Sequence, residues 1–116
     1  MIRIAIIDDE QPALLISEST ISSYFQTKGH EAKIDAFQNP LSFLANEKEE
    51  AYDLVFLDID MPQRNGIDVA KEIVNIKKDT TLIFLSQRED LVFDTLPLHP
   101  FGFIRKSRIK IGRAHV

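Results

Sequence analysis

The chain has 116 residues, enough for one domain with a single core, and no cysteine, which excludes disulfides and thiolate metal sites. Its formal charge is -4, from 14 basic and 18 acidic residues. Because binding to nucleic-acid phosphates needs a basic face, this charge argues against direct nucleic-acid binding by this chain. Because 44% of the residues are hydrophobic, we expect a buried core. We find no signal-peptide pattern and no apolar run long enough to span a membrane, and we expect a cytoplasmic protein.

Strand and helix patterns alternate along the chain. Apolar runs predict strands over 2–7, 31–37, 54–57, 81–85 and 102–104. Helical patterns follow the first four strands, at about 12–28, 40–47, 67–77 and 89–96. Strands that alternate with helices predict an α/β fold with a doubly wound parallel sheet. No apolar periodicity follows the fifth strand, so the last helix of such a fold is not evident.

The second predicted helix carries its own start signal. Asn39 is an expected N-cap, and Pro40 suits the first helical position. We expect Leu41, Leu44 and Ala45 to form its inward stripe.

Polar side chains stand where four predicted strands end. Asp8 and Asp9 follow the first strand, Asp58 the third, Ser86 the fourth and Lys106 the fifth. Because the carboxyl ends of parallel strands share one edge, these residues should lie close together. Three carboxylates suit Mg²⁺, and without a cation they would repel one another. A carboxylate can attack a phosphoryl group, whose oxygens a lysine and a hydroxyl can then stabilise.

Each residue alone has an ordinary explanation. An acidic doublet is usually a solvated loop, and a single aspartate such as Asp58 can be a turn residue. Ser86 alone suggests a structural role and Lys106 a surface charge. Their joint placement at four strand ends favours a functional site.

In this order the residues resemble the receiver domain of two-component response regulators, from Ile2 to Lys106. Asp58 matches the family's phosphoacceptor, and Met61-Pro62 and Gly66 match the loop after it. The resemblance implies a five-stranded, flavodoxin-like sheet, here without an evident last helix.

The resemblance also implies a magnesium site. Asp9 would bind Mg²⁺ directly and Asp8 largely through water. Asp58 and the backbone carbonyl of Asp60 would complete the protein ligands.

Three further roles follow from the resemblance. Lys106 and Ser86 would contact the phosphoryl group, and Phe103 would be the switch aromatic. A sensor histidine kinase would be the phosphoryl donor, and the domain would act as a signalling module rather than a turnover enzyme.

The sequence around Asp58 and after Lys106 resembles that of receiver domains that precede a LytTR-type DNA-binding domain. We expect a receiver domain over 1–109 and a tail over 110–116, which an expression vector could have contributed. DNA would be contacted only through an effector domain outside this chain, to control transcription, with no membrane partner. Two departures from the family are Ser107 in place of a proline joined by a cis bond, and Gln87 in place of a small residue.

Two alternatives stay open. Asp58-Ile59-Asp60 resembles the Asp-x-Asp motif of small magnesium-dependent phosphohydrolases, although that motif normally ends a first strand. A pseudo-receiver, an interaction domain that is never phosphorylated, is the other.

Two expectations concern geometry. Asp60 and Arg88 should form a salt bridge over the mouth of the site. Without a last helix, parts of Ile4, Ile6, Phe103 and Ile104 should face water and drive self-association, so a homodimer could form.

Overall fold

The computed structural model describes residues 1–47, 52–59, 68–72, 80–86 and 102–105. They contain a parallel sheet of five strands in the order β2-β1-β3-β4-β5. The strands are β1 (Ile2–Ile7), β2 (Ala32–Phe37), β3 (Leu54–Asp58), β4 (Thr81–Ser86) and β5 (Gly102–Arg105). This is the flavodoxin-like strand order, so the predicted sheet is confirmed, with β3 in its middle.

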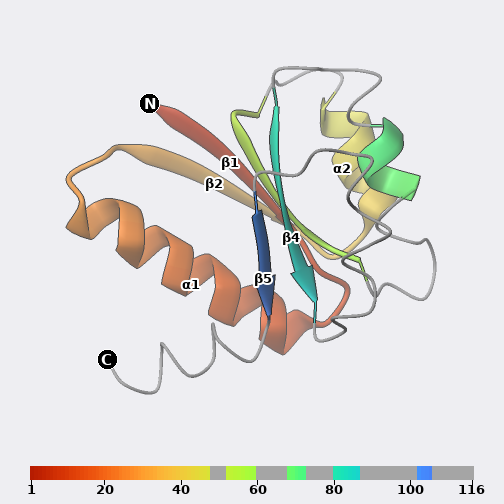
Figure 1. Cartoon of the computed structure of the whole chain (residues 1–116), viewed down its shortest axis with the longest axis horizontal. Helices are drawn as coiled ribbons and strands as arrows, with labels where there is room; N and C mark the ends of the chain where they lie inside the picture. The colour runs from red at the N-terminus through yellow and green to blue at the C-terminus, as the bar shows by residue number, and fades with distance from the viewer. Residues whose placement is uncertain (48–51, 60–67, 73–79, 87–101, 106–116) are drawn as a thin grey trace.

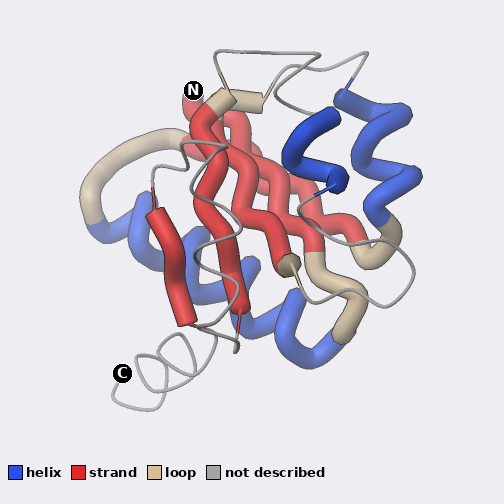
Figure 2. The backbone as a smooth tube through the Cα atoms, turned by 45° about the vertical axis from the view of Figure 1, so that its right-hand side comes forward, coloured by secondary structure: helices blue, strands red, loops and turns tan. Residues whose placement is uncertain are grey.

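Helices cover both faces of the sheet. Helix α1 (Gln11–Thr27) lies on one face, and α2 (Pro40–Glu47) lies on the other together with the helical segment 68–72 (Figures 1 and 2). The fourth predicted helix and the region after Lys106, where we expected no last helix, lie outside the described residues.

Alternate residues of the central strands divide the core into two layers. Ile4, Ile6, Phe56, Ile83 and Leu85 pack with Leu14 and Ile21 of α1. Their strand neighbours Ala5, Ile7, Val55, Leu57, Leu82 and Phe84 pack with Phe43 and Leu44 of α2 and with Val69 and Ala70. Both faces of these strands are therefore dry, as their nearly continuous apolar sequences predict.

The ends of α1 follow from local sequence. Pro12 lies in the first turn, where its missing N–H costs no hydrogen bond. After the helix, Gly29 takes a φ of 75°, a conformation that glycine adopts without strain, and its N–H donates to the Gln26 carbonyl at 3.1 Å.

The start of α2 confirms the predicted cap and corrects the predicted stripe. Asn39 Oδ1 accepts a hydrogen bond from the Leu41 N–H at 2.8 Å. However, Leu41 is 59% exposed and Ala45 is also exposed, whereas Phe43 and Leu44 are buried. The Phe43 ring packs edge-on against that of Phe37 of β2, with 5.6 Å between centroids, so the inward face of α2 is the one that carries Phe43.

The expected apolar patch on the α1 face is also corrected in part. Ile4 and Ile6 are both 0% exposed, because they lie in the α1 layer of the core with Leu14 and Ile21. For Phe103 and Ile104 the structure describes the strand but not the side chains.

Candidate functional site

Asp58 is the last residue of the middle strand. It is 0% exposed and lies in register with Leu85 of β4. The ladder continues past it, since the Ile59 N–H donates to the Leu85 carbonyl at 3.2 Å. Leu57 and Ile59 on either side are 0% and 2% exposed. The backbone that carries Asp58 is therefore fixed by two buried neighbours and a hydrogen bond.

Asp8 reaches the same place from β1. Ile7 is in register with Leu57, so the next residue along β1 lies level with Asp58. The Asp8 N–H donates to the Phe37 carbonyl at 3.0 Å, and its Oδ1 accepts a hydrogen bond from the Glu10 N–H at 3.0 Å. These two bonds orient the side chain at the turn that leads into α1.

The three predicted metal ligands lie together. One carboxylate oxygen from each of Asp8, Asp9 and Asp58 falls within 4.8 Å of the others. Asp8 and Asp58 are fully buried, while Asp9 is partly exposed. Burial weakens screening by water, so the negative charges repel strongly unless a cation offsets them.

The donor set fits a hard divalent ion. All three side chains offer only oxygen, which Mg²⁺ and Ca²⁺ prefer, and no thiolate exists in the chain. Asp9 is partly exposed, so one ligand of the cluster is in contact with solvent, as suits an ion that keeps several waters. Among the described residues, this is the acidic cluster with metal-ligand spacing.

Ser86 and Phe103 lie on the two strands that continue the sheet beyond β3. Ser86 is the last residue of β4, one position beyond Leu85, the register partner of Asp58. Phe103 lies in β5, in register with Phe84. Strand β5 ends at Arg105, directly before Lys106.

Several predicted residues lie outside the described part of the chain: Asp60, Gln87, Arg88, Lys106 and Ser107. The expected Asp60–Arg88 salt bridge and the geometry of the Lys106–Ser107 bond therefore stay predictions.

Two supporting contacts were missed by sequence reasoning. An aspartate in a turn often accepts a hydrogen bond from the backbone N–H two positions on, and this signal was present in Asp8-Asp9-Glu10. The buried anchor Ile59 had no such signal, because it sits between two polar residues that suggest a loop.

The family model for the response regulator receiver domain matches residues 4–111. The chain belongs to this family. Receiver domains are signalling domains of two-component systems and not typical turnover enzymes, so the phosphohydrolase alternative loses its support.

Two curated response regulators are similar in sequence. SaeR of Staphylococcus aureus is 30% identical over 110 residues, which are 91% of this chain and 44% of SaeR. The sensory transduction protein LytT of Bacillus subtilis is 23% identical over 106 residues, covering 91% of this chain and 42% of LytT. The chain thus spans less than half the length of these relatives.

Solved receiver structures share the fold. The Thermotoga maritima response regulator TrrA, solved in complex with Mg²⁺-BeF, is 30% identical, with a TM-score of 0.73 over 90% of this chain and 86% of that one. The DrrB receiver domain, in a BeF3-activated form, is 21% identical, with a TM-score of 0.77 over 99% of this chain and 95% of that one. The CheY-like receiver fold is therefore shown. None of the described helices is both long and apolar enough to cross a membrane.

Proposed function

We propose that this receiver domain accepts a phosphoryl group on Asp58 from a sensor histidine kinase, the donor that response regulators use. The observation that carries the proposal is the gathering of Asp8, Asp9 and Asp58 at the carboxyl ends of β1 and β3. Asp58 is the acceptor because it ends the middle strand, with acidic residues to one side and the ends of β4 and β5 to the other.

In the transfer, a carboxylate oxygen of Asp58 attacks phosphorus. The bond between phosphorus and the kinase histidine nitrogen breaks, and an acyl phosphate forms on Asp58. Mg²⁺, when bound, would neutralise charge on the phosphoryl oxygens. Asp9 would bind the ion directly, and Asp8 would act largely through water. The backbone carbonyl of Asp60 would be a further ligand.

The other strand ends complete the proposed site. The Ser86 hydroxyl would donate a hydrogen bond to one phosphoryl oxygen, and Lys106 would neutralise another. The new group adds roughly two negative charges. Movement of Ser86 toward it, with Phe103 following, would change the surface near β5.

The proposed output is the control of transcription. We propose a receiver domain over 1–109 in the cytoplasm, with a tail over 110–116. A DNA-binding effector domain, of the LytTR type by resemblance, would control transcription. SaeR is named a response regulator and LytT a sensory transduction protein, which supports a role in signalling.

The experiment is incubation with Mg²⁺ and acetyl phosphate, followed by intact mass measurement. We expect one phosphoryl adduct in the wild type and none in Asp58→Asn. Asp68→Asn, which changes an exposed carboxylate on the segment 68–72, is the matched control and should be phosphorylated normally. A wild type that binds Mg²⁺ but takes up no phosphoryl group would instead be a pseudo-receiver.

A further inference from the structure

Strand β2 forms one edge of the described sheet and pairs with β1. Two hydrogen bonds bracket this pairing: the Ile2 N–H donates to the Glu31 carbonyl at 3.0 Å, and the Asp8 N–H donates to the Phe37 carbonyl at 3.0 Å. Main-chain groups of successive strand residues point in alternate directions within the sheet. The odd positions from 31 to 37 therefore direct their N–H and C=O groups toward β1.

The even positions point the other way. Ala32, Ile34 and Ala36 direct their N–H and C=O groups away from the sheet, as a row able to bind another strand. Ala36 is exposed, and Ala32 and Ile34 are partly exposed. Of these three residues, only Ile34 has a bulky side chain, so the outward N–H and C=O groups of Ala32 and Ala36 are accessible.

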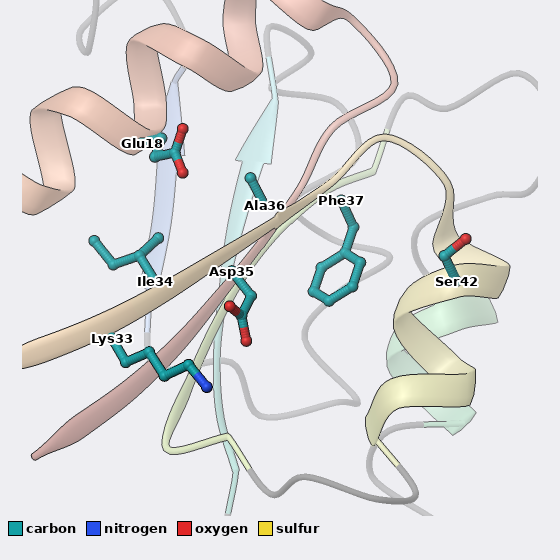
Figure 3. A pocket seen from close by; sticks show the side chains of 7 residues that line it. All are labelled: Glu18, Lys33, Ile34, Asp35, Ala36, Phe37 and Ser42. Carbon is teal, nitrogen blue, oxygen red and sulfur yellow. The ribbon is translucent and has the colours of Figure 1, made fainter.

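The space beside this edge is open. A groove of about 550 Å³ runs along positions 33–37, between Glu18 of α1 and Ser42 of α2 (Figure 3). A neighbouring strand lies about 4.8 Å away in a sheet, so a groove open to solvent along the edge can admit one.

The edge sequence is self-complementary. Residues 32–36 read Ala-Lys-Ile-Asp-Ala, which is symmetric about Ile34 apart from the opposite charges of Lys33 and Asp35. In an antiparallel pair of two such strands centred on Ile34, Lys33 of each faces Asp35 of the other. Positions 33 and 35 then form non-hydrogen-bonded pairs, whose side chains come closest.

A parallel, in-register pair would instead place Lys33 opposite Lys33 and Asp35 opposite Asp35, which is destabilising. Charges on edge strands usually discourage pairing. Here they select one orientation, in which the outward groups of Ala32, Ile34 and Ala36 all find partners.

We propose that the β2 edge binds a second copy of this chain by antiparallel β2–β2 pairing about a two-fold axis at Ile34. The contact is isologous and joins the two sheets into one. Ile34 meets its own copy on the α1 face, and the two Lys33–Asp35 pairs lie on the α2 face, where Asp35 Oδ2 accepts a hydrogen bond from the Tyr52 hydroxyl at 2.8 Å. Because the strand is short, we expect a weak dimer, with a dissociation constant on the order of 10–1000 µM.

The dimer does not depend on the proposed phosphorylation. Antiparallel strands place the carboxyl ends of the two sheets at opposite ends of the pairing, so both Asp58 sites stay open. Asp58→Asn should dimerise like the wild type, and the two proposals can fail separately.

Charge reversal provides the test, read by sedimentation equilibrium of the full chain. Lys33→Asp and Asp35→Lys should each raise the dissociation constant at least about tenfold, because two like-charge pairs form. A mixture of these two variants should form a heterodimer, and the double variant Lys33→Asp/Asp35→Lys should dimerise with itself. Lys71→Asp, an exposed lysine on 68–72 with the same charge change, should leave the constant unchanged.

Amide hydrogen exchange of the wild type gives a readout that needs no variant. The N–H groups of Ile34 and Ala36 should become protected as concentration rises, while those of Lys33 and Asp35 should be protected at every concentration. A wild type that stays monomeric up to about 1 mM would overturn the proposal. So would a dimer that Lys33→Asp does not weaken, or in which the amides of Ile34 and Ala36 stay unprotected.

Discussion

The Tyr52 hydroxyl donates a hydrogen bond to Asp35 Oδ2 at 2.8 Å and so ties the segment before β3 to the edge strand β2. Tyr52 is only 1% exposed, and its ring lies 5.8 Å from that of Phe43 and 6.4 Å from that of Phe37, centroid to centroid. Strands β2 and β3 are not neighbours in the sheet, since β1 lies between them. The Tyr52 contacts therefore link the segment before β3 to β2 and to α2.

Tyr52→Phe removes this hydrogen bond and keeps the ring. We expect the free energy of unfolding to fall by about 1 kcal/mol, measured by urea denaturation. Tyr24→Phe, at a tyrosine that is 52% exposed, is the control and should change little. Equal stability of Tyr52→Phe and the wild type would show that the bond contributes nothing.

The Asn39 cap of α2 allows a second stability test. Asn39→Ala leaves the Leu41 N–H without its side-chain acceptor and should cost about 1 kcal/mol. Asn39→Asp supplies an oxygen at the same place and should restore the stability. If both substitutions destabilise the protein equally in urea, the cap is not the cause.

Ile59 is expected to stabilise the core and to position Asp58. Ile59→Ala should lower the free energy of unfolding by about 2–5 kcal/mol, and Ile59→Val by about 0.5–1.5 kcal/mol. Because the buried Ile59 side chain helps to fix the backbone next to Asp58, we also expect slower phosphorylation by acetyl phosphate in Ile59→Ala under conditions in which it stays folded. Unchanged phosphorylation would restrict Ile59 to a packing role.

Repulsion within the carboxylate cluster predicts opposite effects with and without metal. Asp8→Asn keeps an oxygen that can accept the Glu10 N–H but removes one buried charge. Its thermal midpoint without Mg²⁺ should exceed that of the wild type, and Mg²⁺ should raise it less. A lower midpoint without metal would mean that repulsion does not dominate at this site.

The two acidic neighbours should differ in their effect on metal affinity. We expect Asp9→Asn to weaken Mg²⁺ binding more than Asp8→Asn does, since Asp9 is the proposed direct ligand. Titration followed by NMR would measure both dissociation constants. Equal losses would refute this order.

Much of the fold could be predicted because its strands are short apolar runs with polar ends. Parallel strands buried on both faces need such runs, and the five predicted strands correspond to those of the structure within a residue at each end. Because the carboxyl ends of parallel strands share one edge of the sheet, the sequence also predicted that Asp8, Asp9 and Asp58 would lie close together, as they do.

Tertiary packing set the features that sequence did not reveal. Leu41 and Ala45 match a helical stripe as well as Phe43 does, but it is Phe43 that packs in the core cluster with Tyr52. Ile4 and Ile6 were expected to be exposed in part, yet they are buried in the layer that contains Leu14 and Ile21 of α1. Ile59 reads as a loop residue because it lies between two aspartates, yet it is buried and its N–H donates to Leu85 of β4.

The most direct test of the central claim is to locate the phosphoryl group. Borohydride reduces an aspartyl phosphate to homoserine, and peptide mass spectrometry can find the altered residue after treatment with Mg²⁺ and acetyl phosphate. The account predicts reduction at Asp58, dependent on Mg²⁺, and the same site after transfer from a histidine kinase. Reduction at another carboxylate, or none in a protein that binds Mg²⁺, would contradict it.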